Sequence, residues 1–296
     1  MNVGGVILDL AEAARARCVF IVGIGKNVGK TVTARSIYEA ASSRGRCTGI
    51  ASVGRDGEAV DVADNVPKPR LYLHPGTVLA TAREALPRSP AVQVLAVSSL
   101  QTAAGPLLYG RAMAGANYEL IGPPSASGVR DVVSWLTQRC DIVVVDGAID
   151  RVAALAGTLG AIVVAAGASA AGTPAEAADA IGALTQRLTV PVYDPRDDAL
   201  HVEGALMPSR IAQLIAAREE RQVVVRDPTQ IALTGRASAH VFAHLRIRCV
   251  RPLTVIAATV ASIGRERSFE PRAFGQAVAR ATGLPTFDVY AGERAA

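Results

Sequence analysis

The sequence contains little cysteine and few aromatic residues, and both shortages narrow the class of protein. The 296 residues include four cysteines with no C-x-x-C pair, so we expect neither a disulfide framework nor a thiolate zinc site. Aromatic residues make up 4% of the chain, which leaves few platforms on which bases could stack. The net charge is +5, but the arginines are scattered among acids. We therefore do not expect nucleic-acid binding.

Long apolar runs are also missing. Residues 152–175 carry no charge, but their apolar core at 161–166 is far shorter than the ~20 residues of a membrane-spanning helix. Asp9 and Glu12 interrupt the segment where a secretory signal would need an apolar run. With 50% hydrophobic and 19% charged residues, the chain does not have the composition of a disordered protein. We expect a cytoplasmic protein with no membrane partner.

Short apolar runs alternate with helical patterns, which predicts an α/β fold with a parallel sheet covered by helices on both faces. The expected strands are 18–23, 47–53, 92–98, 117–121, 141–146, 161–167 and 190–193, and the expected helices are 5–17, 30–43, 76–86, 127–139 and 174–187. Residues 101–110 are expected to form a loop.

The composition of the chain changes near residue 195, after which charged residues are more frequent. This predicts a main domain of residues 1–200 and a smaller C-terminal α/β region, 201–296, that serves as a partner or self-association surface. Its expected strands are 202–206, 222–226, 247–250, 253–260 and 286–290, and its expected helices are 208–219, 235–245 and 271–282.

Lysine is scarce, and its distribution points to a site. Of the three lysines, Lys26 and Lys30 lie in one glycine-rich segment, and the third is Lys68. That segment follows an expected buried strand and opens an expected helix, which is the setting of a phosphate-binding loop. Glycines let backbone N–H groups approach phosphate, and the helix N-terminus adds the positive end of its dipole. The expected phosphate-binding residues are Gly25, Lys26, Asn27, Val28, Gly29, Lys30 and Thr31.

Carboxylates that follow two expected strands are candidates for the metal site. Asp146 ends the apolar run 141–146, and Asp56 follows the second strand beside Arg55. The carboxyl ends of parallel strands meet at one edge of a sheet, so we expect Asp146 near the phosphate loop. We predict that Thr31, Asp146 and Asp56 bind Mg²⁺ and that Arg55 contacts phosphate. Lys30, Asp146 and Asp56 are the expected catalytic residues.

ATP is the expected nucleotide, because no N-K-x-D or T-K-x-D sequence is present to bind guanine. Five residues, rather than the usual four, separate Gly23 from Gly29. This longer loop resembles that of dethiobiotin synthetase and its relatives in the SIMIBI class of P-loop proteins. Lys26 lies four residues before Lys30, whereas the signature lysine of ParA/MinD-like ATPases lies five before, so that role is not transferred to Lys26.

Longer segments resemble the ATP-binding proteins that reactivate adenosylcobalamin-dependent lysine 5,6-aminomutase and ornithine aminomutase. These segments are residues 25–31, 52–58, 145–151 and 269–274. The resemblance implies an accessory ATPase that works with a MutS-like companion subunit to expel inactivated cobalamin from the mutase. In it, Lys30, Thr31 and Asp146 would bind and hydrolyse Mg-ATP.

Two alternatives stay open. A ligase similar to dethiobiotin synthetase would activate a carboxylate or carbamate, but that family uses a lysine at the end of the second strand, where this chain has Arg55. The third interpretation is a nucleotide-sensing module without catalytic activity.

Overall fold

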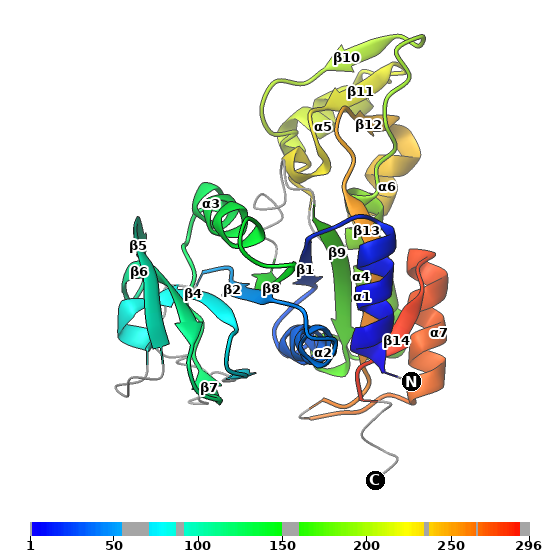
Figure 1. The fold of residues 1–296 in the computed structure, drawn as a ribbon. Coiled ribbons are helices and arrows are strands. Elements are labelled where there is room, and N and C mark those ends of the chain that lie inside the picture. The colour runs from blue at the N-terminus through cyan, green and yellow to red at the C-terminus, as the bar shows by residue number, and fades with distance from the viewer. Residues whose placement is uncertain are drawn as a thin grey trace. The chain divides into compact units, whose positions relative to one another are not determined.

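The computed structural model describes residues 2–54, 71–86, 92–149, 160–233, 237–264 and 266–290. The described residues fall into two compact units. The first contains residues 2–22, 30–149 and 160–161, and the second contains residues 23–29 and 162–290 within the described ranges. The expected boundary between residues 200 and 201 falls inside the second unit. The fold is α/β, with mostly parallel strands and flanking helices, as predicted (Figure 1).

The first unit combines three helices with two groups of strands. Its main strands are hydrogen-bonded in the order β1-β8-β2-β4-β6-β5, and β3 pairs with β7. The helices are α1 (Val3–Ala13), α2 (Lys30–Ser43) and α3 (Ala126–Thr137), and the strands are β1 (Cys18–Gly23), β2 (Thr48–Ser52), β3 (Leu71–Leu73), β4 (Val78–Ala82), β5 (Val92–Thr102), β6 (Gly105–Ala112), β7 (Ala116–Tyr118) and β8 (Ile142–Ile149).

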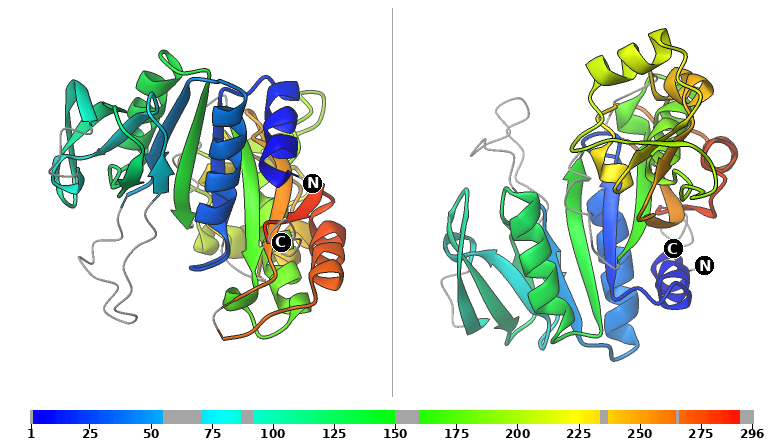
Figure 2. Two further views of the ribbon diagram at one scale, coloured as in Figure 1. Left: turned by 60° about the horizontal axis from the view of Figure 1, so that its bottom comes forward. Right: turned by 90° about the horizontal axis from the view of Figure 1, so that it is seen from above.

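Helices cover both faces of β2 in this unit. Successive side chains of a strand point to opposite faces. A Cβ at Gly49 would lie 3.3 Å from the Cβ of Leu136 on α3, whereas the next residue, Ile50, packs in a cluster with Tyr38 of α2. The two helices therefore lie on opposite sides of the strands, as the views in Figure 2 show. Every residue of β1 is buried, as expected for a strand covered on both faces.

Two predictions fail at one end of this group of strands. Residues 76–86 form β4 and a short 3₁₀ turn instead of a helix, and residues 101–110 contribute to β6 instead of a loop. β4 pairs with β6 and β6 with β5, both antiparallel, so the sheet is not purely parallel. All five residues of β4 are buried, and non-local pairing overrides their helical pattern.

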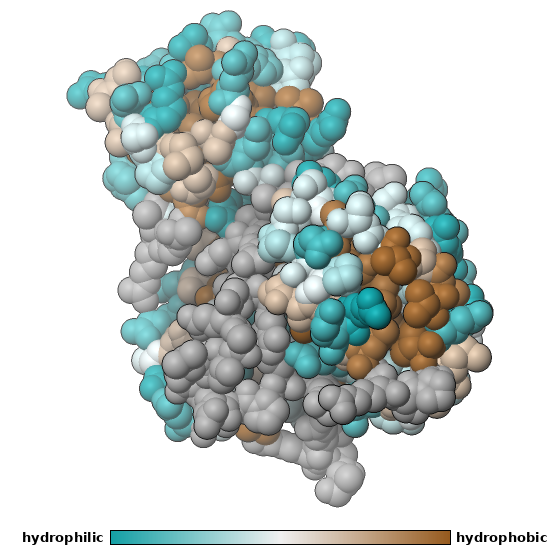
Figure 3. All heavy atoms as spheres, turned by 90° about the vertical axis from the view of Figure 1, so that its left-hand side faces the viewer, coloured by the Kyte–Doolittle hydropathy of each residue, from teal (hydrophilic) through white to brown (hydrophobic). Residues whose placement is uncertain are grey.

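β5 ends the strand order among the described strands, and it exposes apolar side chains. Val94, Leu95 and Val97 are exposed, and 70% of the surface of Val97 is accessible. The face of the molecule that Figure 3 shows carries a group of apolar side chains. No residue of β5 is charged. Exposed apolar edges of this kind are uncommon in monomeric proteins.

The second unit contains the remaining helices and strands. β13 and β14 pair in parallel in the order β14-β13-β9, and a three-stranded parallel sheet has the order β10-β11-β12. The helices are α4 (Pro174–Leu188), α5 (Pro208–Ala216), α6 (Ala237–His244) and α7 (Pro271–Thr282), and the strands are β9 (Ala161–Gly167), β10 (Ala199–His201), β11 (Gln222–Val225), β12 (Ile247–Cys249), β13 (Thr254–Ala261) and β14 (Thr286–Asp288).

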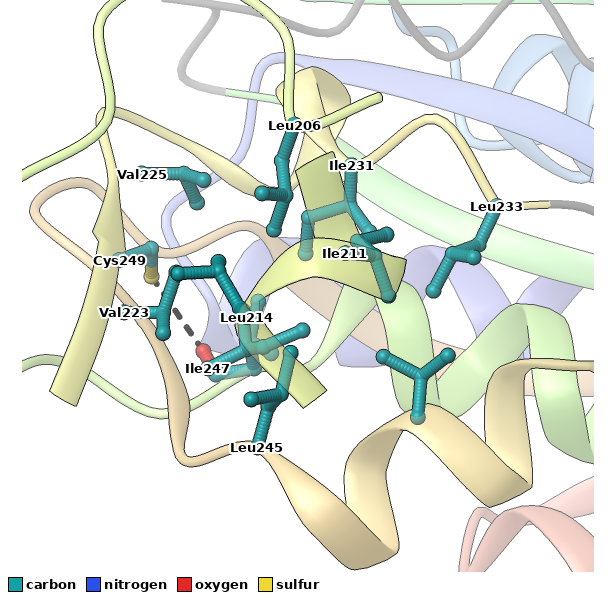
Figure 4. Packing of buried hydrophobic residues seen from close by; sticks show 12 residues of the cluster. Leu206, Ile211, Leu214, Val223, Val225, Ile231, Leu233, Leu245, Ile247 and Cys249 are labelled. Atoms are coloured by element: carbon teal, nitrogen blue, oxygen red, sulfur yellow. Dashed lines mark hydrogen bonds between the residues drawn. The ribbon is translucent and has the colours of Figure 1, made fainter. Parts of the chain in front are cut away.

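The three-stranded sheet has its own apolar core. The buried side chains come from its strands, from α5 and α6 and from the intervening loops (Figure 4). Cys249 lies inside this core, where its thiol donates a hydrogen bond to the carbonyl oxygen of Val190 at 3.3 Å, and burial raises its pKa to about 11. It is therefore a packing residue.

Two strands expected in this part of the chain differ from those observed. Residues 190–193 form only an isolated bridge between Val192 and Cys249. The strand expected at 202–206 is not observed among the described strands, because β10 already ends at His201 and Leu206 forms only an isolated bridge with Ile231. None of the described helices has the length and apolar character that spanning a membrane requires.

Candidate functional site

The glycine-rich segment links β1 to α2, and its last glycine needs a backbone that other residues rarely adopt. Gly29 has φ +87°, and a Cβ there would lie 2.9 Å from the Cβ of Ala261. Asn27 also has a positive φ, 55°. Both the left-handed backbone and the close packing favour glycine at position 29.

The rest of the segment packs closely within the second unit. Val28 is buried, and a Cβ at Gly167, the last residue of β9, would lie 2.6 Å from the Cα of Val28. Gly25 lies near Ala170, since its Cβ would be 3.5 Å from that of Ala170. Lys26 and Asn27 are exposed. Val28 therefore anchors the loop while its two preceding residues face outward.

Lys30 and Thr31 begin α2 in the first unit. Lys30 is buried, with 9% of its surface accessible, and Thr31 is half-buried. The first turn of α2 contains no acidic residue, so no carboxylate of its own offsets the partial positive charge of the helix start. A lysine at a helix N-terminus makes this position suited to an anion.

Asp146 meets this helix start from β8. The hydroxyl of Thr31 donates a hydrogen bond of 2.7 Å to Oδ2 of Asp146. Asp146 lies inside β8 rather than at its end, because the strand continues to Ile149. It pairs in register with Ser52 of β2. The structure thus brings together Lys30, Thr31 and Asp146, which are far apart in sequence.

The electrostatic state of Asp146 reflects its burial. Burial raises the pKa of its carboxyl above the ordinary value. Three weaker influences lower the pKa: the hydrogen bond from Thr31, the positive charge of Lys30 and the backbone N–H of Gly147. The carboxylate therefore lacks solvation that a cation would replace.

The oxygens of this cluster fit a divalent cation. Oδ1 of Asp146 is buried and has no hydrogen-bond partner among the described residues. The Thr31 hydroxyl uses its proton on Asp146, so the lone pairs of its oxygen stay available. Carboxylate and hydroxyl oxygens are the hard ligands that Mg²⁺ prefers. The arrangement can hold such an ion beside a bound phosphate.

Two expected site residues, Arg55 and Asp56, lie outside the described residues, as does most of the segment 52–58 that carries part of the family resemblance. Within the described ranges, no three or more His, Cys, Asp or Glu side chains are grouped as a metal site.

Sequence reasoning missed Ser52. Its register pairing with Asp146 places it at the end of β2, and a Cβ at Gly147 would be 3.3 Å from its Oγ. The signal that could have found it was its position at the carboxyl end of a predicted strand.

Comparison with known protein families, with curated proteins and with solved structures finds no match to this chain. The resemblance to aminomutase-reactivating proteins consequently stays a prediction.

Proposed function

We propose that this chain binds Mg-ATP and hydrolyses it as an accessory ATPase. The observation that carries the proposal is the hydrogen bond between Thr31 and Asp146 near the charge of Lys30, with the second carboxylate oxygen buried and without a hydrogen-bond partner among the described residues. A buried carboxylate oxygen without a partner is costly unless a cation or donor meets it. In a P-loop NTPase-like site, this cost is offset when a cation binds together with the nucleotide.

Each residue has a distinct task in this proposal. The N–H groups of the loop and of the start of α2 bind phosphate oxygens, and the Lys30 ammonium adds positive charge near the outer phosphates. Thr31 and Asp146 hold the metal ion through their oxygens. Mg²⁺ supplies neutralisation of the charge that develops on the phosphates. Asp56 and Arg55 stay candidates for contacts with metal and phosphate.

The partner assignment rests on the resemblance alone. We propose that the ATPase cycle remodels a cobalamin-dependent aminomutase together with a MutS-like companion. Because protein-remodelling ATPases of this kind are coupled to their partner, we expect slow hydrolysis by the isolated chain and faster hydrolysis when partner is present.

Phosphate release by the purified protein tests both parts. It is measured with Mg²⁺ and with EDTA, alone and with an aminomutase that carries damaged cofactor and its companion subunit. We expect Mg²⁺-dependent release, stimulation by the mutase, and loss of both in Lys30→Ala. A rate of phosphate release that does not change when the mutase is added contradicts the partner assignment. A rate that is the same in Lys30→Ala and in wild type contradicts the ATPase site itself.

A further inference from the structure

Two buried polar atoms at the ends of β13 and β14 have no hydrogen-bond partner among the described residues. They are Oγ of Ser262 and Oδ2 of Asp288. Ser262 is 1% exposed. The other carboxylate oxygen of Asp288 accepts a hydrogen bond from the backbone N–H of Tyr290 at 2.8 Å, which fixes the side chain. A buried polar atom without a partner destabilises the fold unless something binds it.

The two atoms belong to neighbouring strand ends. β13 and β14 are parallel, with Val260 opposite Asp288, and the N–H of Val289 donates to the carbonyl oxygen of Val260 at 3.0 Å. Ser262 directly follows the last residue of β13. Ligands of open parallel sheets bind outside the carboxyl ends of the strands. Ser262 and Asp288 therefore lie where a ligand of this sheet is expected.

The chain neighbours of both residues touch the last glycine of the glycine-rich loop. A Cβ at Gly29 would lie 2.9 Å from the Cβ of Ala261 and 3.5 Å from Cγ2 of Val289. Ala261 precedes Ser262, and Val289 follows Asp288. All of these residues are in the second unit. The strand ends that carry Ser262 and Asp288 therefore flank the last glycine of this loop.

Hydrogen bonds join the loop after β13 to Ser262 and to the segment that follows β9. The N–H of Phe269 donates to the carbonyl oxygen of Ser262 at 2.9 Å, so the backbone carbonyl of Ser262 is satisfied, whereas its hydroxyl has no partner in the part of the chain that the structure describes. Arg267 donates to the carbonyl oxygen of Ala171 at 3.0 Å, which joins this loop to the segment after β9. That segment also holds Ala170 beside Gly25 of the glycine-rich loop.

We propose that Ser262 and Asp288 select the adenine base of the bound nucleotide. This rests on the proposed function, since it requires that the loop hold phosphates. The carboxylate of Asp288 only accepts hydrogen bonds, and the 6-amino group of adenine donates one. The Ser262 hydroxyl donates to a ring nitrogen of the base. In the same orientation, guanine would place the oxygen at its six position against the carboxylate, without a proton between them.

A panel of matched ligands tests the selection. Dissociation constants are measured by calorimetry for ATP, GTP, ITP, purine riboside triphosphate and inorganic tripolyphosphate, all with Mg²⁺. Purine riboside triphosphate differs from ATP only in lacking the 6-amino group. Loss of a hydrogen bond to a charged group should weaken its binding at least about tenfold relative to ATP. GTP and ITP should bind more weakly than ATP.

Two variants assign the contacts. Asp288→Asn keeps an oxygen for the Tyr290 N–H but offers an amide N–H₂ to the base, so we expect it to prefer ITP over ATP. Ser262→Ala should weaken ATP and purine riboside triphosphate equally, because both have the ring nitrogens. Tripolyphosphate binding should stay unchanged in both variants. Asp179→Asn, an exposed position on α4, is the matched control and should behave as wild type.

The failures of the two proposals are distinguishable. The wild-type protein could bind both tripolyphosphate and ATP and yet fail to distinguish adenine. Equal affinity for purine riboside triphosphate and ATP would overturn the adenine selection, as would an affinity for GTP that matches or exceeds that for ATP. Either result would leave the phosphate site intact. Asp288→Asn that keeps the preference for ATP overturns the role of Asp288. Wild-type protein that binds neither ATP nor tripolyphosphate overturns the proposed function itself.

Discussion

The hydroxyl of Thr31 donates a hydrogen bond of 2.7 Å to the carboxylate of Asp146, across 115 positions of the chain. This contact joins the start of α2 to the middle of β8. It leaves one oxygen of a buried carboxylate without a hydrogen-bond partner among the described residues. A metal ion held at this point would satisfy that oxygen and the lone pairs of Thr31 together.

Substitutions of Thr31 test whether this residue contributes to nucleotide binding through the metal ion or through the phosphates. Thr31→Val has nearly the same shape but no hydroxyl, so we expect Mg-ATP affinity to fall about tenfold or more, whereas Thr31→Ser should stay within about threefold of wild type. Titration calorimetry with Mg²⁺ and with EDTA measures this. With EDTA, the Val variant and wild type should bind ATP equally. A Val variant that loses affinity to the same degree without metal would show that Thr31 does not act through Mg²⁺.

Asp146 should make the ligand-free protein less stable at neutral pH. Burial raises its pKa in the folded state, so the folded protein binds its proton more tightly than the unfolded chain does. The contribution of this group to the free energy of unfolding is therefore largest at low pH. It falls as pH rises from the ordinary carboxyl pKa to the raised one, and stays low above it.

Asp146→Asn removes this cost and still offers an oxygen to Thr31. Without nucleotide, we expect it to melt above wild type at pH 8, by a margin that shrinks as the pH is lowered into the carboxyl range. With Mg-ATP, wild type should gain stability and the variant should not. Thermal melting followed by circular dichroism from pH 5 to pH 8 measures both effects. A variant that melts below wild type at pH 8 contradicts the assigned cost of burial.

Gly29 should tolerate no side chain. In Gly29→Ala, the added Cβ would meet the Cβ of Ala261 at 2.9 Å, and φ +87° is unfavourable for alanine. We expect ATP affinity to fall about tenfold or more, together with a loss of stability of about 1 kcal/mol or more from the backbone alone.

Gly45 supplies the matched control for this substitution. It also has a positive φ, 69°, but a Cβ there has nothing within 4 Å. Gly45→Ala should share the backbone cost and keep its ATP affinity. Calorimetry beside denaturant unfolding compares the two variants. Equal ATP affinity in Gly29→Ala and Gly45→Ala would mean that the shape of the loop does not matter for binding.

Local sequence patterns predicted the elements that carry the candidate site. β1 is a continuous apolar run, and α2 follows the glycine-rich segment with the expected bounds, residues 30–43. The end of the apolar run at Asp146 predicts that it lies near the start of α2, and the two residues do meet, although β8 continues past Asp146 to Ile149. The burial of Asp146 and its unpartnered oxygen did not follow, because they depend on how the whole sheet is covered.

Elements held by distant partners were not predictable from local pattern. The alanines and leucine of β4 fit either period, and its pairing with β2 and with β6 makes it a strand. β6 contains glycine and proline, which are typical of loops, but it pairs with β4 on one side and β5 on the other. Ser262 and Asp288 lie more than two hundred positions from the glycine-rich segment, and no motif links them to it.

Lys30 provides the most direct test of the account, through the melting temperature of the protein with and without Mg-ATP. At a hundredfold excess over the dissociation constant, binding adds ~2.7 kcal/mol to the free energy of unfolding. For a protein of this size that corresponds to a rise of about 5–10 °C. We predict this rise for wild type and for Arg210→Ala, an exposed arginine on α5, and its near-complete loss in Lys30→Ala. A wild type that shows no rise, or a Lys30→Ala variant that keeps it, would contradict the claim that this chain binds ATP at Lys30.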